Sequence, residues 1–302
     1  MKTPQYSHRF AGDLLALSAM ILFAGYSLFL RLNPEVPTLL FLFAFQAVGA
    51  GVFALIFLRD GLPKILSRQT IVLLVLLAFV AVAHDFVYFF SFRLTSVANA
   101  AVGHQTVSIF LLFFAPYFLK EKTTRSEWIA VGLGIVGTVV LFYDAHPHQK
   151  IDWRHFEGIA LAVLSGMLYA LLIILYRHLQ NGALLTLRTI NFFRYVLSVL
   201  MLLPFLSLFR DFHWTPHATM VLLSFGLLYA VIASCMLQLA MKWSRALHIS
   251  VIGKSEPVFA TLYAFLFLHE VPTWNAILGG AMIIGTSLWL VLLMHEGEDV
   301  YE

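Results

Sequence analysis

The chain has 302 residues, of which 61% are hydrophobic and only 12% are charged. Soluble domains carry roughly 45–50% apolar and about 25% charged residues, and a soluble fold needs a polar surface that this composition cannot supply. The formal net charge of +3 is typical of basic cytoplasmic loops in a membrane protein. The composition therefore predicts a protein embedded in a lipid bilayer, with no nucleic-acid partner.

A helix needs roughly 20 residues to cross the hydrocarbon layer. Ten apolar stretches of the chain are about this long. In chain order they are Ala11–Arg31, Pro37–Leu58, Thr70–Ser91, Ser96–Leu119, Ser126–Tyr143, Glu157–Leu179, Leu184–Leu208, Ala218–Met241, His248–Leu268 and Pro272–Met294. The first is too long for the apolar core of a signal peptide. The short connections predict antiparallel neighbours. We expect an all-α membrane protein with ten transmembrane helices.

The Lys and Arg residues between these spans predict the orientation. If the N-terminus is cytoplasmic, eleven of them lie on the cytoplasmic side and five on the other, with Arg188 near the boundary. Cytoplasmic loops are enriched in Lys and Arg, so both termini are expected in the cytoplasm. The short loops and termini favour a bacterial inner membrane over an organelle.

The two halves of the sequence resemble each other. Residues 92–137 echo residues 242–285 at an offset of 148–150 residues, and in both copies a small-residue-rich span ends in a glutamate, Glu121 or Glu270, before a glycine-rich span. We therefore expect two repeats, 11–142 and 157–294, joined by the loop 143–156. Each repeat holds five helices, so the second would be inverted relative to the first. Inverted repeats with a central site are the architecture of carriers that work by alternating access.

These motifs resemble the drug/metabolite transporter superfamily, and in particular the ten-helix transporters with two EamA-type repeats. The second repeat carries Glu256-Pro257-Val-Phe-Ala, then Glu270 and the glycines Gly279, Gly280 and Gly285. The first repeat carries Glu121 and then Gly132, Gly134 and Gly137, but has Thr106-Val107 in place of Glu-Pro. The resemblance implies a carrier of small molecules, more commonly an exporter, and leaves open amino acids, sugars, nucleotide-sugars, organic cations and drugs as substrates.

Few charged or polar side chains lie inside the predicted spans. They are His84, Asp85, His104, Arg194, Lys254 and Glu256, with Gln46, Asn99 and Asn191 as uncharged companions. A charge at the centre of the bilayer costs about 2.5–3.5 kcal/mol on insertion scales, so each should face a cavity or a partner. Tyr88 lies one helical turn from His84 and Asp85. Structural ion pairs without a role in transport, and a purely packing role for His104, remain open alternatives.

The ninth span carries the sharpest local pattern. Pro257 has no N–H group, so the carbonyl of Gly253 loses its helical partner and the helix should kink. Lys254 and Glu256 flank this point, and at two residues apart they would point to nearly opposite faces of a regular helix. We expect Lys254 to face the centre. The glycines of spans five and ten are expected to pack the halves together or to form a dimer face, so the protein is a monomer or a homodimer.

Together these observations predict a secondary carrier of a small polar or amphipathic metabolite. Arg194 or Lys254 would hold a carboxylate or phosphate, and Asp85 or Glu256 would hold an ammonium group or carry a coupling proton. An aromatic portion would lie against tyrosines of four different spans. These are Tyr26, Tyr88, Tyr169 and Tyr229. Both signs of charge favour an amino-acid-like zwitterion, with an organic-cation, multidrug or sugar carrier as the alternative.

The sequence carries few features of other classes of membrane protein. No catalytic motif, cofactor-binding loop or metal-ligand spacing supports an intramembrane enzyme, and the loops are too short for a receptor or scaffold surface. The loop histidines His146, His148 and His155 lack an acid or cysteine at fixed spacing, which is typical of a solvated loop. Neither a cofactor nor a metal is expected.

Overall fold

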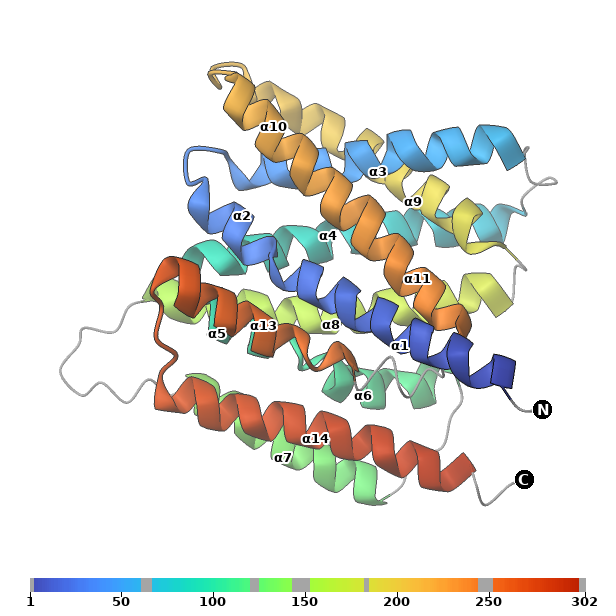
Figure 1. The fold of residues 1–302 in the computed structure, drawn as a ribbon, viewed down its shortest axis with the longest axis vertical. Helices are drawn as coiled ribbons and strands as arrows, with labels where there is room; N and C mark the ends of the chain where they lie inside the picture. The colour runs from blue at the N-terminus through green and yellow to red at the C-terminus, as the bar shows by residue number, and fades with distance from the viewer. Residues whose placement is uncertain are drawn as a thin grey trace.

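The computed structural model describes residues 3–60, 67–119, 125–142, 153–181, 185–243 and 252–298, and all regular secondary structure in these ranges is helical. Figure 1 shows the helices running side by side, with α1 beginning and α14 ending at the same end of the bundle. The elements are α1 (Thr3–Ala24), α2 (Tyr26–Leu32), α3 (Thr38–Asp60), α4 (Arg68–Leu94), α5 (Val97–His104), α6 (Val107–Leu119), α7 (Arg125–Phe142), α8 (Trp153–Asn181), α9 (Leu187–Leu202), η1 (Leu203–Phe209), α10 (Pro216–Phe225), η2 (Gly226–Ala233), α11 (Ser234–Trp243), α13 (Glu256–Tyr263), η3 (Ala264–Leu268) and α14 (Trp274–Glu298).

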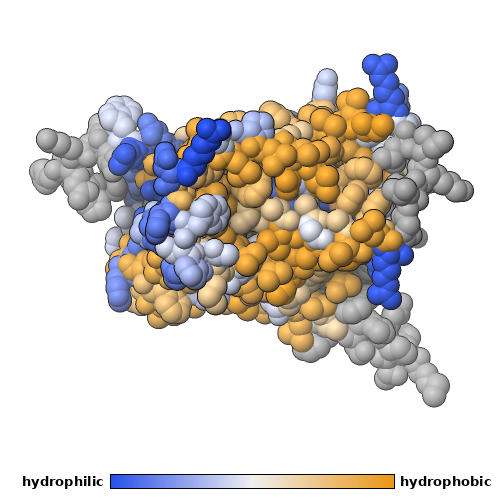
Figure 2. Space-filling view, turned by 90° about the horizontal axis from the view of Figure 1, so that it is seen from above, coloured by the Kyte–Doolittle hydropathy of each residue, from blue (hydrophilic) through white to orange (hydrophobic). Residues whose placement is uncertain are grey.

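Within the described residues, six helical stretches are long and apolar enough to cross a membrane. They are Ala11–Leu32, Thr38–Arg59, Arg68–Leu94, Trp153–Gln180, Leu187–Phe209 and Pro216–Leu237. Figure 2 shows a broad band of hydrophobic residues around the middle of the molecule, with hydrophilic residues gathered at its two ends. Large apolar side chains such as Leu55, Phe79 and Met220 are exposed on this surface. Such a surface is expected where the solvent is hydrocarbon.

Hydroxyl side chains mark the starts of several helices. Ser67 accepts a hydrogen bond from the N–H of Thr70 at the start of α4, and Ser96 accepts one from Asn99 at the start of α5. Thr186 and Thr215 cap α9 and α10 in the same way. Each cap satisfies one of the N–H groups that the first turn of a helix leaves without a partner.

Helices of the first half of the chain pack mainly against helices of the second half. The largest contacts are those of α4 with α8, α7 with α14, α3 with α9 and α1 with α11. The pair α7 and α14 is closely packed at its glycines, since a methyl group at Gly137 would lie 2.8 Å from Cβ of Met282. Small residues at such positions let two helix backbones approach each other in lipid.

Besides the turn at Gly25 that separates α1 from α2, two of the predicted spans are broken helices. Instead of one helix over Ser96–Leu119, α5 ends at His104 and α6 begins at Val107. The N–H groups of Gln105 and Thr106 bond to carbonyls three residues back, those of Val102 and Gly103, so the helix tightens into a turn. α6 continues past Pro116, although a proline inside a helix removes one backbone hydrogen bond.

The second break lies in the ninth span. Lys254 and Ser255 form a turn, the N–H of Ser255 bonds to the carbonyl of Ile252, and α13 begins at Glu256 with Pro257 in its first turn. Proline is favoured at such a position because the first turn needs no N–H donor. The turn residues Gln105 and Lys254 are 149 residues apart, which is the offset between the two halves of the sequence.

Candidate functional site

Asp85 lies at the centre of a buried polar cluster. Its Oδ2 accepts a hydrogen bond of 2.7 Å from Nε2 of Gln46 on α3 and another of 3.1 Å from the guanidinium of Arg194 on α9. Its Oδ1 lies 2.8 Å from Nδ1 of His84, the preceding residue on α4. Both oxygens of the carboxylate therefore have partners within the protein, as a buried charge requires.

Arg194 ties the second half of the chain to this carboxylate. Its guanidinium also lies 4.5 Å from the ring centre of Tyr195 and 5.9 Å from that of Phe45, a favourable arrangement for a cation. Its Nε atom is buried and has no hydrogen-bond partner among the described residues. The Asp85–Arg194 contact is an ion pair between the two halves of the chain.

Four aromatic side chains form a layer beside this ion pair. The ring of Tyr88 is stacked on His104 with centres 4.3 Å apart, and Tyr169 on α8 lies 5.2 Å from the rings of both His84 and His104. Nδ1 of His104 is 2.9 Å from Oγ of Ser165 on α8. The buried His104 is thus held by an aromatic ring of α4 and by a hydroxyl group of α8.

Lys254 and Glu256 both reach side chains of the first half. Nζ of Lys254 donates a hydrogen bond of 3.2 Å to Oε1 of Gln105, and the hydroxyl of Tyr88 donates one of 3.1 Å to Oε1 of Glu256. The sequence suggested nearly opposite directions for Lys254 and Glu256, which holds for a regular helix. The turn at Lys254 and Ser255 changes this, because the residue interval of 3.6 per turn applies only within continuous helix.

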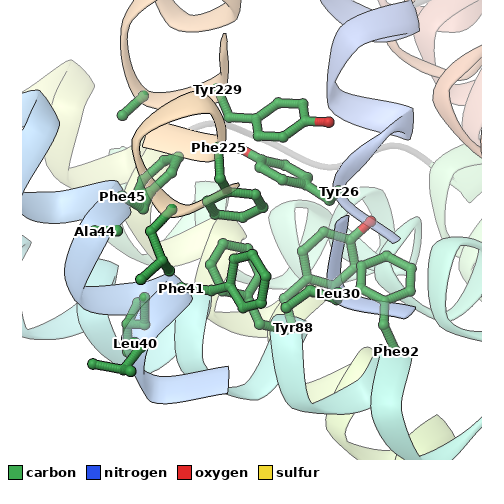
Figure 3. Close-up of a cluster of buried hydrophobic side chains, with 14 of the residues drawn as sticks. Tyr26, Leu30, Leu40, Phe41, Ala44, Phe45, Tyr88, Phe92, Phe225 and Tyr229 are labelled. Atoms are coloured by element: carbon green, nitrogen blue, oxygen red, sulfur yellow. The ribbon is translucent and has the colours of Figure 1, made fainter. Parts of the chain in front are cut away.

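The predicted tyrosines divide into two neighbouring groups. Tyr88 and Tyr169 line the polar cluster, whereas Tyr26 and Tyr229 belong to an aromatic cluster with ring centres 4.4 Å apart. Figure 3 shows Tyr26, Tyr88, Phe225 and Tyr229 in the same cluster of buried side chains. Tyr26 connects the groups, since its ring centre is 6.5 Å from that of Tyr88.

A second set of polar contacts, at one end of the bundle, joins α2 and α5 to the segment that follows η3. The guanidinium of Arg31 lies 3.0 Å from Oε1 of Glu270, whose Oε2 accepts a hydrogen bond of 2.9 Å from the N–H of Val97 at the start of α5. His269, which precedes Glu270, has a left-handed backbone with φ of 56°. This conformation ends η3 and turns the following carboxylate toward α2 and α5.

No group of three His, Cys, Asp or Glu residues within the described ranges is arranged to hold a metal ion. His155 lies at hydrogen-bond distance from Thr95 and Asn99. His146 and His148 are outside the described residues.

Three neutral side chains in the cluster received little or no weight in the sequence. Gln46 is among the uncharged polar residues expected inside the spans, whereas Gln105 and Ser165 are not among the residues expected in the site. The sequence pairing of Thr106-Val107 with Glu256-Pro257 aligns Gln105 with Ser255, whereas the turns of the two broken helices, 105–106 and 254–255, align it with Lys254. Gly253 lies at the break, and a Cβ added there would meet no atom within 4 Å, so its role is not one of close packing.

Comparison with known proteins gives a consistent result. The EamA-like transporter family matches residues 10–143 and 156–292. The chain is 24% identical to an uncharacterized transporter of Archaeoglobus fulgidus over 292 residues, 94% of this chain and 98% of the relative. It is 26% identical over 201 residues to an uncharacterized transporter of Clostridium kluyveri, covering 66% of this chain and 65% of that relative.

A crystal structure with 18% sequence identity has the same fold. Its TM-score to this chain is 0.64, and the match covers 93% of this chain and 98% of that one. At this identity the likeness concerns the fold alone. The family match extends over most of both halves and confirms the resemblance that the sequence motifs indicated. The chain belongs to the EamA-like transporter family of the drug/metabolite transporters, and it is a multi-pass membrane transporter.

Proposed function

We propose that the protein is a secondary carrier that moves a small amphipathic zwitterion, an amino acid or a close analogue, by alternating access. The observation that carries this proposal is the break before α13. There the two charged residues of the second half, Lys254 and Glu256, meet polar side chains of the first half, Gln105 and Tyr88. Broken helices that meet a partner repeat are where many carriers hold their substrates.

The architecture that we propose has ten spans in two inverted repeats of five, residues 11–142 and 157–294. The six long apolar helices supply six spans, and α5 with α6, α7, α13 with η3, and α14 would supply the others. The pairing of helices supports this proposal. The contact of α4 with α8 has its equivalent in that of α11 with α1, while α3 with α9 and α7 with α14 are each their own equivalents. A twofold axis in the membrane plane produces such a pattern.

The proposed substrate contacts follow from the partners of each charge. Asp85 and Arg194 neutralise each other, so we assign them the role of coupling the two halves. Lys254 would bind the carboxylate of the substrate, and Glu256 with Tyr88 would bind its ammonium group. The rings of Tyr169, Tyr26 and Tyr229 would receive an apolar or aromatic side chain.

A binding screen followed by transport measurements tests this function. The purified protein is screened by thermal shift with amino acids, organic cations, sugars, nucleosides and sugar phosphates, since a ligand of the folded state raises the Tm. We expect stabilisation by amino acids, and loss of that stabilisation in Lys254→Gln and Glu256→Gln. Arg68→Gln, which changes an exposed cation at the start of α4, is the matched control. Stabilisation by organic cations or by sugars alone would replace the zwitterion by the corresponding alternative substrate.

The direction and the energy source are part of the same proposal. We place both termini in the cytoplasm of a bacterial cell and propose export, with protons as coupling ions. The same-side position of the ends of α1 and α14 supports the orientation (Figure 1). In proteoliposomes, an imposed pH gradient should drive accumulation of the amino acid. Exchange that ignores the gradient would identify an uncoupled facilitator or exchanger.

A further inference from the structure

Gln105 occupies the position in the first half that Lys254 occupies in the second. Both residues lie in the turn of a broken helix, and they are 149 residues apart in the sequence. Both are buried, with 4% and 7% of their surface exposed. The two equivalent residues contact each other directly. A twofold axis that relates the two halves would therefore pass between them.

The chemistry of this contact fixes how the Gln105 amide is oriented. An ammonium group has donors only, so Lys254 must be met by the carbonyl oxygen of the amide. The planar amide then carries its two remaining N–H donors on Nε2, beside the ammonium group. A carboxylate with two oxygens is the complementary ligand for such a pair of donors, and hydrogen bonds to a charged group are the stronger kind.

A chain of contacts connects this donor pair to the acidic part of the site. His104, which precedes Gln105, is stacked on Tyr88 with ring centres 4.3 Å apart. Tyr88 donates its hydrogen bond to Glu256, two residues after Lys254. The donors and the carboxylate acceptor are therefore connected through neighbouring side chains of one site.

We infer that Gln105 is a specificity-determining residue: together with Lys254 it selects substrates that carry a carboxylate. This inference rests on the proposed function and adds to it the residue that distinguishes an amino acid from an amine. An acidic side chain at position 105 would neutralise Lys254 and remove the amide donors, whereas the Tyr88–Glu256 contact would remain.

Transport of two matched compounds by wild type and Gln105→Glu tests the inference. The probes are L-phenylalanine and 2-phenylethylamine, which differ by the carboxylate. In Gln105→Glu we expect the KM for L-phenylalanine to rise about tenfold or more, while the KM for 2-phenylethylamine stays the same or falls. Gln105→Met, which cannot pair with Lys254, should raise the first KM without lowering the second. Asn99→Asp is the matched control, because it makes the same amide-to-acid change on α5 at a residue whose amide faces His155.

A reciprocal exchange keeps the test independent of folding defects. The double variant Gln105→Lys with Lys254→Gln moves the cation to the equivalent position of the other half, and we expect it to recover transport of L-phenylalanine relative to Lys254→Gln alone. If the wild type transports amino acids and Gln105→Glu changes both probes alike, the role of Gln105 is refuted while the proposed function stands. If the wild type transports no amino acid, both proposals fall together.

Discussion

Asp85 and Arg194 are 109 residues apart in the chain, and their side chains meet at 3.1 Å inside the bundle. Because the contact joins the two halves, it should contribute to the stability of the whole molecule. Removing one partner of a buried ion pair typically costs about 3–5 kcal/mol, because the other charge stays buried alone. We therefore expect Asp85→Asn and Arg194→Gln each to lower the Tm strongly in detergent.

The double variant distinguishes an ion pair from two independent effects. Asp85→Asn with Arg194→Gln leaves neither charge of the pair without its partner. The Tm of the double variant should therefore be higher than that of the less stable single variant. A double variant whose loss equals the sum of the two single losses would contradict the assignment.

The contacts of Glu270 predict how one end of the bundle opens. Ser91 is fully buried near this end, so Ser91→Cys in a Cys235→Ala background reports access to the interior. Glu270→Ala removes the hydrogen bond to Val97, which is worth about 1.5–3 kcal/mol for a charged acceptor. We expect labelling by a membrane-impermeant thiol reagent to accelerate about tenfold or more, from one side of sealed vesicles only.

The control for this experiment is Glu35→Ala. Glu35 is an exposed carboxylate whose side chain is 4.0 Å from His217, so its loss should leave the labelling rate unchanged. Equal acceleration by both variants would mean that general loosening, and not the Glu270 contact, controls access.

Two glycines of α7 give a matched test of the packing against α14. A Cβ at Gly137 would lie 2.8 Å from Cβ of Met282, whereas one at Gly132 would meet nothing within 4 Å. We expect Gly137→Ala to destabilise the protein by about 1–3 kcal/mol. Gly132→Ala should be neutral or stabilising by up to about 1 kcal/mol, because alanine favours helix. Thermal unfolding of the two variants side by side decides this, and equal Tm values would show that α7 and α14 can separate at no cost.

Replacement of Glu256 tests proton coupling. Its carboxylate accepts from Tyr88 and lies two residues from Lys254. Glu256→Gln should abolish accumulation driven by a pH gradient, while exchange of the amino acid across the membrane continues only at concentrations high enough to offset the weaker binding of its ammonium group. Asp211→Asn, a change at an exposed carboxylate, should leave accumulation intact. Gradient-driven accumulation in Glu256→Gln would assign the coupling proton to another group.

Apolar length was sufficient to locate the long helices. The expected span Thr70–Ser91 corresponds to α4 over Arg68–Leu94, and Pro37–Leu58 to α3 over Thr38–Asp60. The break at Gln105 was not predictable in this way. It depends on backbone hydrogen bonds to residues three back, and no proline marks it.

The charged residues of the site could be predicted from the sequence, but not which of them contact each other. The cost of a charge in lipid is a property of single residues, so Asp85, Arg194, Lys254 and Glu256 could be selected from the sequence alone. Which of them face each other depends on how the halves pack. The Asp85–Arg194 pair and the neutral partner Gln105 therefore became apparent only in three dimensions.

Two of the hydrogen-bond partners of Asp85 become available at different times during synthesis. Gln46 lies 39 residues before Asp85, whereas Arg194 follows it by 109 residues. When α4 leaves the ribosome and enters the bilayer, α3 is already there and can donate to the carboxylate. Gln46 thus serves as a provisional partner for the carboxylate until the helix that carries Arg194 has been made.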